Sequence, residues 1–170
     1  MLSRMTEGTP STGGIAAEGL IVDHDIDMEV VQRATGGSGV IGLLGVQVHE
    51  LTRDRVVMSL PVGPRTHQPT GVLHGGVSAL LAESAASFGA AISAPPGYFA
   101  VGIEINASHL RSMVEGTLTA VATPARKGRT IHVWDIALAD ETGRAICDAR
   151  CTVAIRPGAD PENEASAPGA

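Results

Sequence analysis

Apolar and polar residues alternate along several stretches of the chain, which predicts β-strands because successive side chains of a strand point to opposite faces. The clearest case is IHVWDIALAD, which begins at Ile131, whereas the stretch near Gly116 alternates only partly. The turn residues Asp140–Gly143 then predict a hairpin between the last two strands. In all, the strands that we expect lie at Val40–Glu50, Arg53–Pro61, Phe99–Leu110, Gly116–Ala125, Thr130–Ala139 and Arg144–Ile155.

A different pattern runs from Gly75 to about Ser93, where nearly every residue is apolar or small and Glu83 is the only charged one. This stretch predicts a long helix, and a helix that is apolar or small on all sides is normally buried. We therefore expect about six strands to wrap around it. The fold class that follows is α+β, a curved antiparallel sheet around one central helix, although an α+β sandwich would show a similar pattern.

The two ends of the chain lack such patterns. Residues 1–22 are rich in Gly, Ser, Thr and Pro, and residues 158–170 have a similar composition. Both segments are predicted to be flexible tails, which leaves one domain at residues 23–157. At its start, Asp27 can cap a short helix that runs to about Ala34 and ends at Gly36 and Gly37.

Composition and charge narrow the function. The 170 residues include 21 glycines but only 2 Phe, 1 Tyr and 1 Trp, and the net charge is −6. Nucleic-acid binding is disfavoured, because it needs a basic surface and, for single strands, aromatic platforms. Cys147 and Cys151 would lie roughly 13 Å apart on one strand, too far for a disulfide, so we interpret both as core residues. No apolar run reaches about 18 residues and no secretory signal is evident, so we expect a cytoplasmic protein without a membrane span.

The candidate chemistry gathers around the predicted helix. A lone carboxylate in a buried helix is costly unless it is paired or functional, so Glu83 is a candidate general base or nucleophile. The N–H of Gly75, at the positive end of the helix dipole, can stabilise an oxyanion. Gln68 and His74 precede the helix as candidate positioning groups, and Ser87 lies one turn after Glu83, within reach of a water molecule at that carboxylate.

The spacing of these groups limits how they can cooperate. Gly75 and Glu83 are eight residues apart in the sequence, hence roughly 12 Å along the helix axis. Both cannot contact one carbonyl group within a single chain. Either only one of them is catalytic, or two subunits combine Gly75 of one chain with Glu83 of the other, which requires an obligate dimer.

The segment RTHQPTGVLHGGVSALLAESAAS, followed by VGIEINASHLRS, strongly resembles the hotdog-fold acyl-CoA thioesterases. Within them it is most similar to the branch of the Arthrobacter-type 4-hydroxybenzoyl-CoA thioesterases, and above all to the 1,4-dihydroxy-2-naphthoyl-CoA hydrolases. The resemblance covers about residues 42–155 and implies the hotdog fold, with Glu83 as catalytic carboxylate and Gly75 as oxyanion donor. It also assigns supporting roles to Gln68, His74 and Ser87. The positions that it matches to segments contacting coenzyme A are Gly102, His109, Leu110, Arg111, Ser112, Arg126, Lys127, Gly128, Arg129, Thr130 and Ile131.

The resemblance further implies a homotetramer built as a dimer of dimers, with no metal and no cofactor apart from the coenzyme A of the substrate. Independently, residues 126–129 form the densest basic cluster of an acidic chain, and Arg111 is another cation suited to the phosphates of coenzyme A. The leading hypothesis is hydrolysis of an aryl- or arylacetyl-CoA. A hotdog hydratase or dehydratase acting on acyl thioesters is the alternative, and a non-catalytic acyl-CoA-binding protein ranks third.

Overall fold

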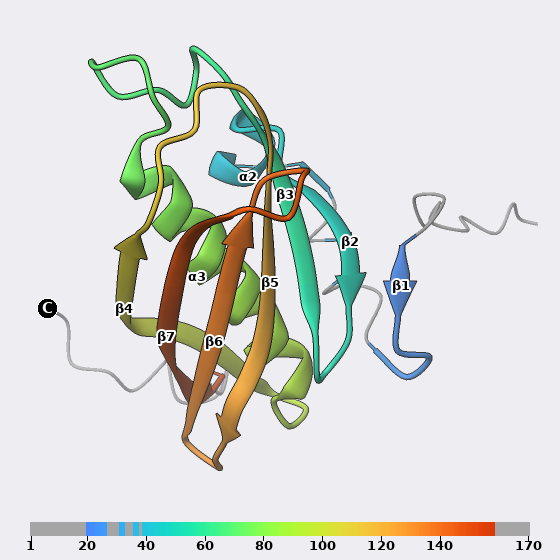
Figure 1. Ribbon diagram of the computed structural model, residues 1–170. Coiled ribbons are helices and arrows are strands. Elements are labelled where there is room, and N and C mark those ends of the chain that lie inside the picture. Colours follow the sequence, from blue (N-terminus) through green and yellow to red (C-terminus); the bar gives the residue numbers. More distant parts are fainter. Residues whose placement is uncertain (1–19, 27–30, 33–35, 38, 159–170) are drawn as a thin grey trace, which may run out of the picture.

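The structure is a computed structural model, and it describes residues 20–26, 31–32, 36–37 and 39–158. Its main elements are a seven-stranded sheet and one long helix, α3 (Gly75–Ser93), with a second helix, α2 (Gly39–Leu43), beside them (Figure 1). The strands are β1 (Ile21–Val22), β2 (Gln47–Leu51), β3 (Val56–Val62), β4 (Tyr98–His109), β5 (Gly116–Lys127), β6 (Ile131–Ala139) and β7 (Ala145–Pro157).

The sheet has the strand order β1-β2-β3-β5-β6-β7-β4, and every neighbouring pair is antiparallel except β1 with β2. The sheet curves around α3, which packs against strands β3 to β7 (Figure 1). This arrangement confirms the predicted α+β class and the helix wrapped by a sheet. The long strand β4 lies at one edge of the sheet, and within the described part of the chain it pairs with β7 alone.

The core lies between α3 and the inward face of the sheet. Alternate residues of β6 and β7 are buried there, and they include Trp134 and both cysteines, Cys147 and Cys151. Gly89 of α3 faces the Trp134 ring so closely that a Cβ atom at Gly89 would overlap the indole. Helix and sheet therefore approach through a position without a side chain, as the glycine-rich and aromatic-poor composition predicts.

The first predicted strand, Val40–Glu50, is wrong in its first half. Residues 39–43 form α2, and β2 begins only at Gln47. Gly39, the first residue of α2, and Gly45, two residues after its end, have φ of 61° and 69°, a left-handed conformation that glycine adopts without strain and that a strand does not contain. The backbone then folds back on itself, since the Val46 N–H donates to the carbonyl of Ile41. The remaining strands and α3 occur where the pattern predicts them.

The other local predictions have different outcomes. Residues 21–22, which we placed in the N-terminal tail, form β1 and pair in parallel with β2, while residues 1–19 and 159–170 lie outside the described part. Of the predicted helix 27–34, only Val31 and Gln32 are described, and both are helical. The hairpin at Asp140–Gly143 is confirmed, because the Gly143 N–H donates to the carbonyl of Asp140.

Helix α3 meets the length and hydropathy of a membrane span, with a mean hydropathy of 1.3 over its apolar window. It is the core helix of the sheet, however, and eight of its residues are buried. Its apolar character is therefore explained by packing within the domain.

Candidate active site

The N-terminus of α3 is fixed by hydrogen bonds of its own residues. His74 is the N-cap, and its Nδ1 accepts a hydrogen bond from the Gly76 N–H at 2.8 Å. The Val77 N–H donates to the carbonyl of His74. Among the described residues no acceptor is bonded to the Gly75 N–H. The first turn therefore presents one free donor at the positive end of the helix dipole, as the sequence predicts.

The loop before α3 holds Gln68 close to this end. The Gln68 N–H donates to the carbonyl of Val72, and the Leu73 N–H donates to the carbonyl of Met113 between β4 and β5. The His74 N–H donates to the carbonyl of Thr66, a buried residue. These hydrogen bonds hold the backbone of the loop at and after Gln68, and therefore fix the point from which the Gln68 side chain projects.

A polar cavity of about 410 Å³ lies beside the N-terminus of α3. In it the His109 ring covers Gly75: an added Cβ at Gly75 would lie 2.6 Å from Nε2 of His109. The structure thus brings the predicted oxyanion donor together with Gln68 and with the segment His109–Ser112. The residues that line this cavity are Gln68, Val72, Leu73, Gly75, Ser78, His109, Leu110, Arg111, Ser112 and Ile146.

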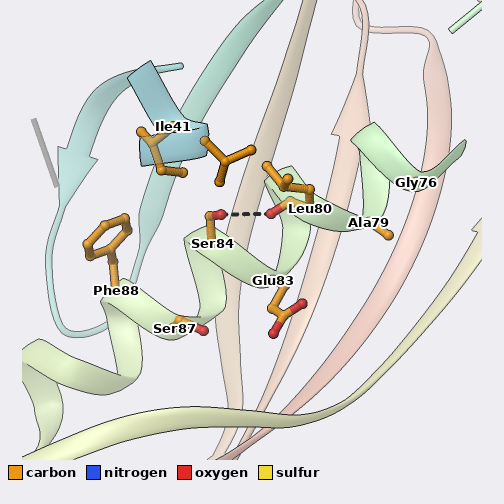
Figure 2. A pocket seen from close by; sticks show the side chains of 9 residues that line it. Ile41, Gly76, Ala79, Leu80, Glu83, Ser84, Ser87 and Phe88 are labelled. Atoms are coloured by element: carbon orange, nitrogen blue, oxygen red, sulfur yellow. Dashed lines mark hydrogen bonds between the residues drawn. The ribbon is translucent and has the colours of Figure 1, made fainter. Parts of the chain in front are cut away.

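Glu83 lies in a second cavity on another side of α3, and its side chain is exposed in the single chain. The expectation that this carboxylate is buried is therefore wrong, because the sheet leaves one face of the helix uncovered. The carboxylate points toward β4 and lies over Gly102, where a Cβ would overlap its Oε1 (Figure 2). Gly102, which we matched to a coenzyme A contact, is placed where its missing side chain makes room for Glu83.

This apolar cavity has a volume of about 500 Å³. Figure 2 shows Glu83 and Ser87 on the same side of the helix, one turn apart, as the sequence predicts. The sequence did not predict the apolar residues that line the cavity beside Glu83. For the lining residues of α2, the apolar run that follows Gly39 could have indicated them. The residues that line it are Val40, Ile41, Gly76, Ala79, Leu80, Glu83, Ser84, Ser87 and Phe88.

The nearby Cys151 is not suited to act as a nucleophile in this cavity. Burial raises the pKa of the nearby Cys151 thiol to about 11, and the carboxylates of Glu83 and Glu104 add to the rise. A thiol that stays protonated at neutral pH is a poor nucleophile. Cys151 is therefore a packing residue, and the described residues contain no cluster of three His, Cys, Asp or Glu side chains that could hold a metal ion.

The basic cluster at residues 126–129 lies at the opposite end of α3 from Gly75. Lys127 Nζ donates to the carbonyl of Arg53, and the hydroxyl of Ser93, the last residue of α3, donates to the same carbonyl. Lys127 also pairs with Asp54 at 2.6 Å. A 19-residue helix extends roughly 27 Å, so within one chain the cluster cannot contact a ligand at Gly75. Thr130 and Ile131 belong to the same hairpin, where the Ile155 N–H donates to the carbonyl of Thr130.

Comparison with known proteins identifies the family. The family model of the thioesterase superfamily matches residues 70–147 of the chain. The 1,4-dihydroxy-2-naphthoyl-CoA hydrolase of Listeria monocytogenes is 43% identical over 113 residues, which are 66% of this chain and 92% of the relative. The proofreading thioesterase EntH of Cronobacter turicensis is 38% identical over 72% of this chain and 89% of its own length.

A solved structure also resembles this chain, and it too is a thioesterase. The crystal structure of a mutant thioesterase from Pseudomonas aeruginosa superposes with a TM-score of 0.72 at 39% sequence identity, and the match covers 79% of this chain and 96% of that one. The fold, the long central helix with its free amide and carboxylate, and these relatives lead to one conclusion: the chain is a member of the hotdog-fold thioesterase superfamily.

Proposed function

We propose that this thioesterase hydrolyses an aryl- or arylacetyl-CoA to the free acid and coenzyme A, with Glu83 as nucleophile or general base and the Gly75 N–H as oxyanion donor. The observation that carries the proposal is the carboxylate of Glu83 at an apolar cavity, on the same helix whose first turn has a free N–H. The Listeria relative, by its name, hydrolyses a bicyclic aryl-CoA, which supports an aromatic acyl group.

The chemistry follows from these two groups. Attack on the thioester carbon converts its carbonyl oxygen to an oxyanion, which the Gly75 N–H stabilises by a hydrogen bond. If water attacks, Glu83 takes its proton, and the departing thiolate of coenzyme A is protonated in turn. If Glu83 itself attacks, an acyl–carboxylate anhydride forms, coenzyme A leaves, and water hydrolyses the anhydride to regenerate the carboxylate. On either route one water is consumed and one acid and one thiol are released.

Two subunits are needed to bring the groups together. His109 of β4 lies at Gly75, and Gly102 of β4 lies at Glu83. Strand β4 is long and lies at an edge of the sheet, and among the described residues no strand other than β7 pairs with it. An edge strand of this kind is open to pairing with a second copy. In an antiparallel β4–β4 pair with its two-fold axis between Ile105 and Asn106, residue 102 of one chain is opposite residue 109 of its partner.

That register places the carboxylate of one protomer level with the free amide of the other. The two α3 helices then run antiparallel, so the basic cluster of each protomer, residues 126–129, comes to the end of the dimer where its partner's Gly75 lies. The cluster can thus serve coenzyme A bound at the polar cavity, together with Arg111. Such an arrangement reconciles the separation of the cluster from Gly75 within one chain with a role in binding phosphates.

We further propose that two such dimers form a homotetramer in the cytoplasm. The outer face of β4 supports a further interface, because Phe99, Val101 and Ile103 alternate along the strand and are exposed by 47%, 43% and 56%. Contiguous exposed apolar side chains of this size are typical of subunit contacts. Sedimentation velocity tests this proposal: a single dimer species at micromolar concentration contradicts it.

The catalytic proposal is tested by release of coenzyme A, detected with a thiol-reactive dye. Glu83→Gln removes the charge and the nucleophile with almost no change in shape, and turnover is expected to fall by about 10³-fold or more. Glu104→Gln is the matched control, because Glu104 is another exposed carboxylate near Cys151, and it retains turnover. Full activity of Glu83→Gln contradicts the assignment, and hydration of an enoyl-CoA without thiol release indicates a hydratase.

Mixing two inactive variants tests the shared site. A Glu83→Gln chain and a Gly75→Pro chain each form homodimers without an intact site. A mixed dimer restores one complete site from the Gly75 of the first chain and the Glu83 of the second, so random mixing returns about one quarter of wild-type activity. If both groups acted within one chain, every site in the mixed dimer would stay defective and no activity would return.

A further inference from the structure

The apolar cavity has two unlike walls. One is α3, which carries Glu83 and Ser87 together with Leu80 and Phe88. The other is α2, whose Val40 and Ile41 line the same cavity. Figure 2 shows Ile41 across the cavity from Ser84 and Phe88, whereas Glu83 leaves the same turn of α3 on the side away from Ile41 and points toward β4. Because Glu83 lines this cavity, a group that reacts at Glu83 can extend past α3 into the apolar space between α3 and α2.

From this placement we infer that the apolar cavity is the acyl site, and that Val40 and Ile41 of α2 form the wall that sets the size of the acyl group. The inference rests on the proposed function and adds a site and two specificity-determining residues to it. A volume of about 500 Å³ lies within the range of small-molecule sites, which are mostly apolar with few polar groups. The polar cavity, with Gln68, His109 and Arg111, suits the polar coenzyme A portion instead.

The lining also defines the chemical class of the acyl group. The polar side chains of the cavity are Glu83, Ser84 and Ser87, and the Ser84 hydroxyl already donates to the carbonyl of Leu80 at 2.7 Å. No Lys, Arg or His is among the lining residues that the structure describes. An acyl group with its own carboxylate would find no cation there and would face the Glu83 carboxylate. The site therefore takes uncharged, apolar acyl groups and rejects dicarboxylic ones.

The attachment of α2 explains why its residues can set specificity without affecting the core. None of its five residues is buried. The helix is held through its backbone: Arg65 donates to the carbonyl of Leu43 at 2.6 Å, and Gly42 contacts the carbonyl of Gly37 so closely that no side chain fits between them. Substitution of Val40 or Ile41 thus changes the cavity wall while these backbone contacts remain.

The experiment compares kcat/KM for acetyl-, hexanoyl-, phenylacetyl- and succinyl-CoA, measured by thiol release in the full chain. Ile41→Phe narrows the cavity, so the ratio of kcat/KM for phenylacetyl-CoA to kcat/KM for acetyl-CoA is expected to fall by about 10- to 100-fold. The double variant Val40→Ala, Ile41→Ala widens it, so the kcat/KM of the longer acyl groups relative to that of acetyl-CoA is expected to rise. The matched controls are Leu43→Phe and Leu43→Ala, because Leu43 lies on the same helix, is 64% exposed and does not line the cavity.

The outcomes separate this inference from the proposed function. Equal substrate profiles for the Ile41 and Leu43 variants, with turnover still abolished by Glu83→Gln, overturn the acyl-site inference and leave the thioesterase mechanism standing. Succinyl-CoA turned over as fast as hexanoyl-CoA overturns the assigned acyl class. If the wild-type chain releases no coenzyme A from any of the four substrates, or if release does not depend on Glu83, the proposed function fails and the inference falls with it.

Discussion

The two halves of α3 each contain a glycine that faces an aromatic ring, Gly75 toward His109 and Gly89 toward Trp134. The rings differ in their surroundings, since the His109 side chain is exposed and Trp134 is completely buried. At the first glycine the missing Cβ exposes a backbone N–H to a cavity, and at the second it allows the helix to pack on the sheet. Glycine thus leaves a backbone N–H open to a cavity at one end of the helix and allows close packing against the sheet at the other.

Among substitutions that test this comparison of the two glycines, the largest effect is expected from Gly75→Pro, which removes the N–H that we assign to the oxyanion. Proline is well tolerated at the first position of a helix, and the extended backbone of His74, with ψ of 127°, suits the residue before it. We expect kcat to fall by about 10²- to 10³-fold relative to Gly75→Ala. Gly75→Ala is the matched control, because both variants place a Cβ against His109 and only proline lacks the donor. Equal kcat values would remove Gly75 from the mechanism.

Gly89→Ala tests the other half of the helix. Alanine normally favours a helix over glycine, but here its Cβ overlaps the buried indole of Trp134. Overpacking of this kind costs about 1–3 kcal/mol of unfolding free energy, measurable by urea denaturation. The activity of the folded fraction stays unchanged, because Gly89 does not line either cavity.

A second substitution sharpens this result. Trp134→Phe makes space for the new methyl group, and the Nε1 atom that it removes has no hydrogen-bond partner among the described residues. The double variant Gly89→Ala, Trp134→Phe is therefore expected to lose less stability than the sum of the single variants. Simple additivity would show that the contact between the two positions does not limit the packing.

His74→Ala tests whether His74 contributes to stability alone or also to turnover. Loss of the N-cap bond to the Gly76 N–H is expected to cost about 1 kcal/mol of unfolding free energy, and His74→Asn should restore most of it because asparagine is also a good cap. The kcat of His74→Asn decides what else the residue does. Recovery of both stability and kcat means that His74 acts by holding the helix end, whereas recovery of stability alone means that it also positions the substrate.

The smallest effect concerns His132, which lies two residues before Trp134 on β6. Burial lowers the pKa of His132 below its ordinary value of 6.5, and the nearby positive charge of Lys127 lowers it further, while a hydrogen bond to the Gly128 backbone opposes the shift. In acid the unfolded chain takes up a proton that the folded chain excludes, so stability declines as the pH falls below about 6.5. The unfolding free energy of His132→Leu should depend less on pH between 7.5 and 5.5. The exposed His24, changed to Gln, is the control and retains the wild-type slope.

The sequence predicted α3 with its bounds, because a glycine pair at one end and a long run of small and apolar residues leave few alternatives. It did not predict α2, since Val40 and its neighbours form an apolar run that also fits a strand, and the helix depends on backbone turns at two glycines. The exposure of Glu83 was missed for a different reason: periodicity predicts a packed helix but does not say which face a single chain leaves open.

In the candidate site, too, some residues could be placed from the sequence and others only from the folded chain. Gln68, His74 and Gly75 are close in sequence, so local rules placed them together correctly. The proximity of Gly75 to His109, and of Glu83 to Gly102, depends on how β4 crosses α3, which only the folded chain determines. The position of residues 126–129 at the far end of α3 is likewise a property of strand order and not of spacing along the chain.

The N-cap of α3 also restricts the role of its own histidine. Because Nδ1 of His74 accepts from the Gly76 N–H, this bond uses the tautomer of the imidazole that carries its proton on Nε2. In that tautomer the outward nitrogen can donate to a substrate carbonyl or to water, but it has no lone pair with which to take a proton from either. In the mechanism that we propose, the group that accepts a proton during hydrolysis is therefore the carboxylate of Glu83 and not His74.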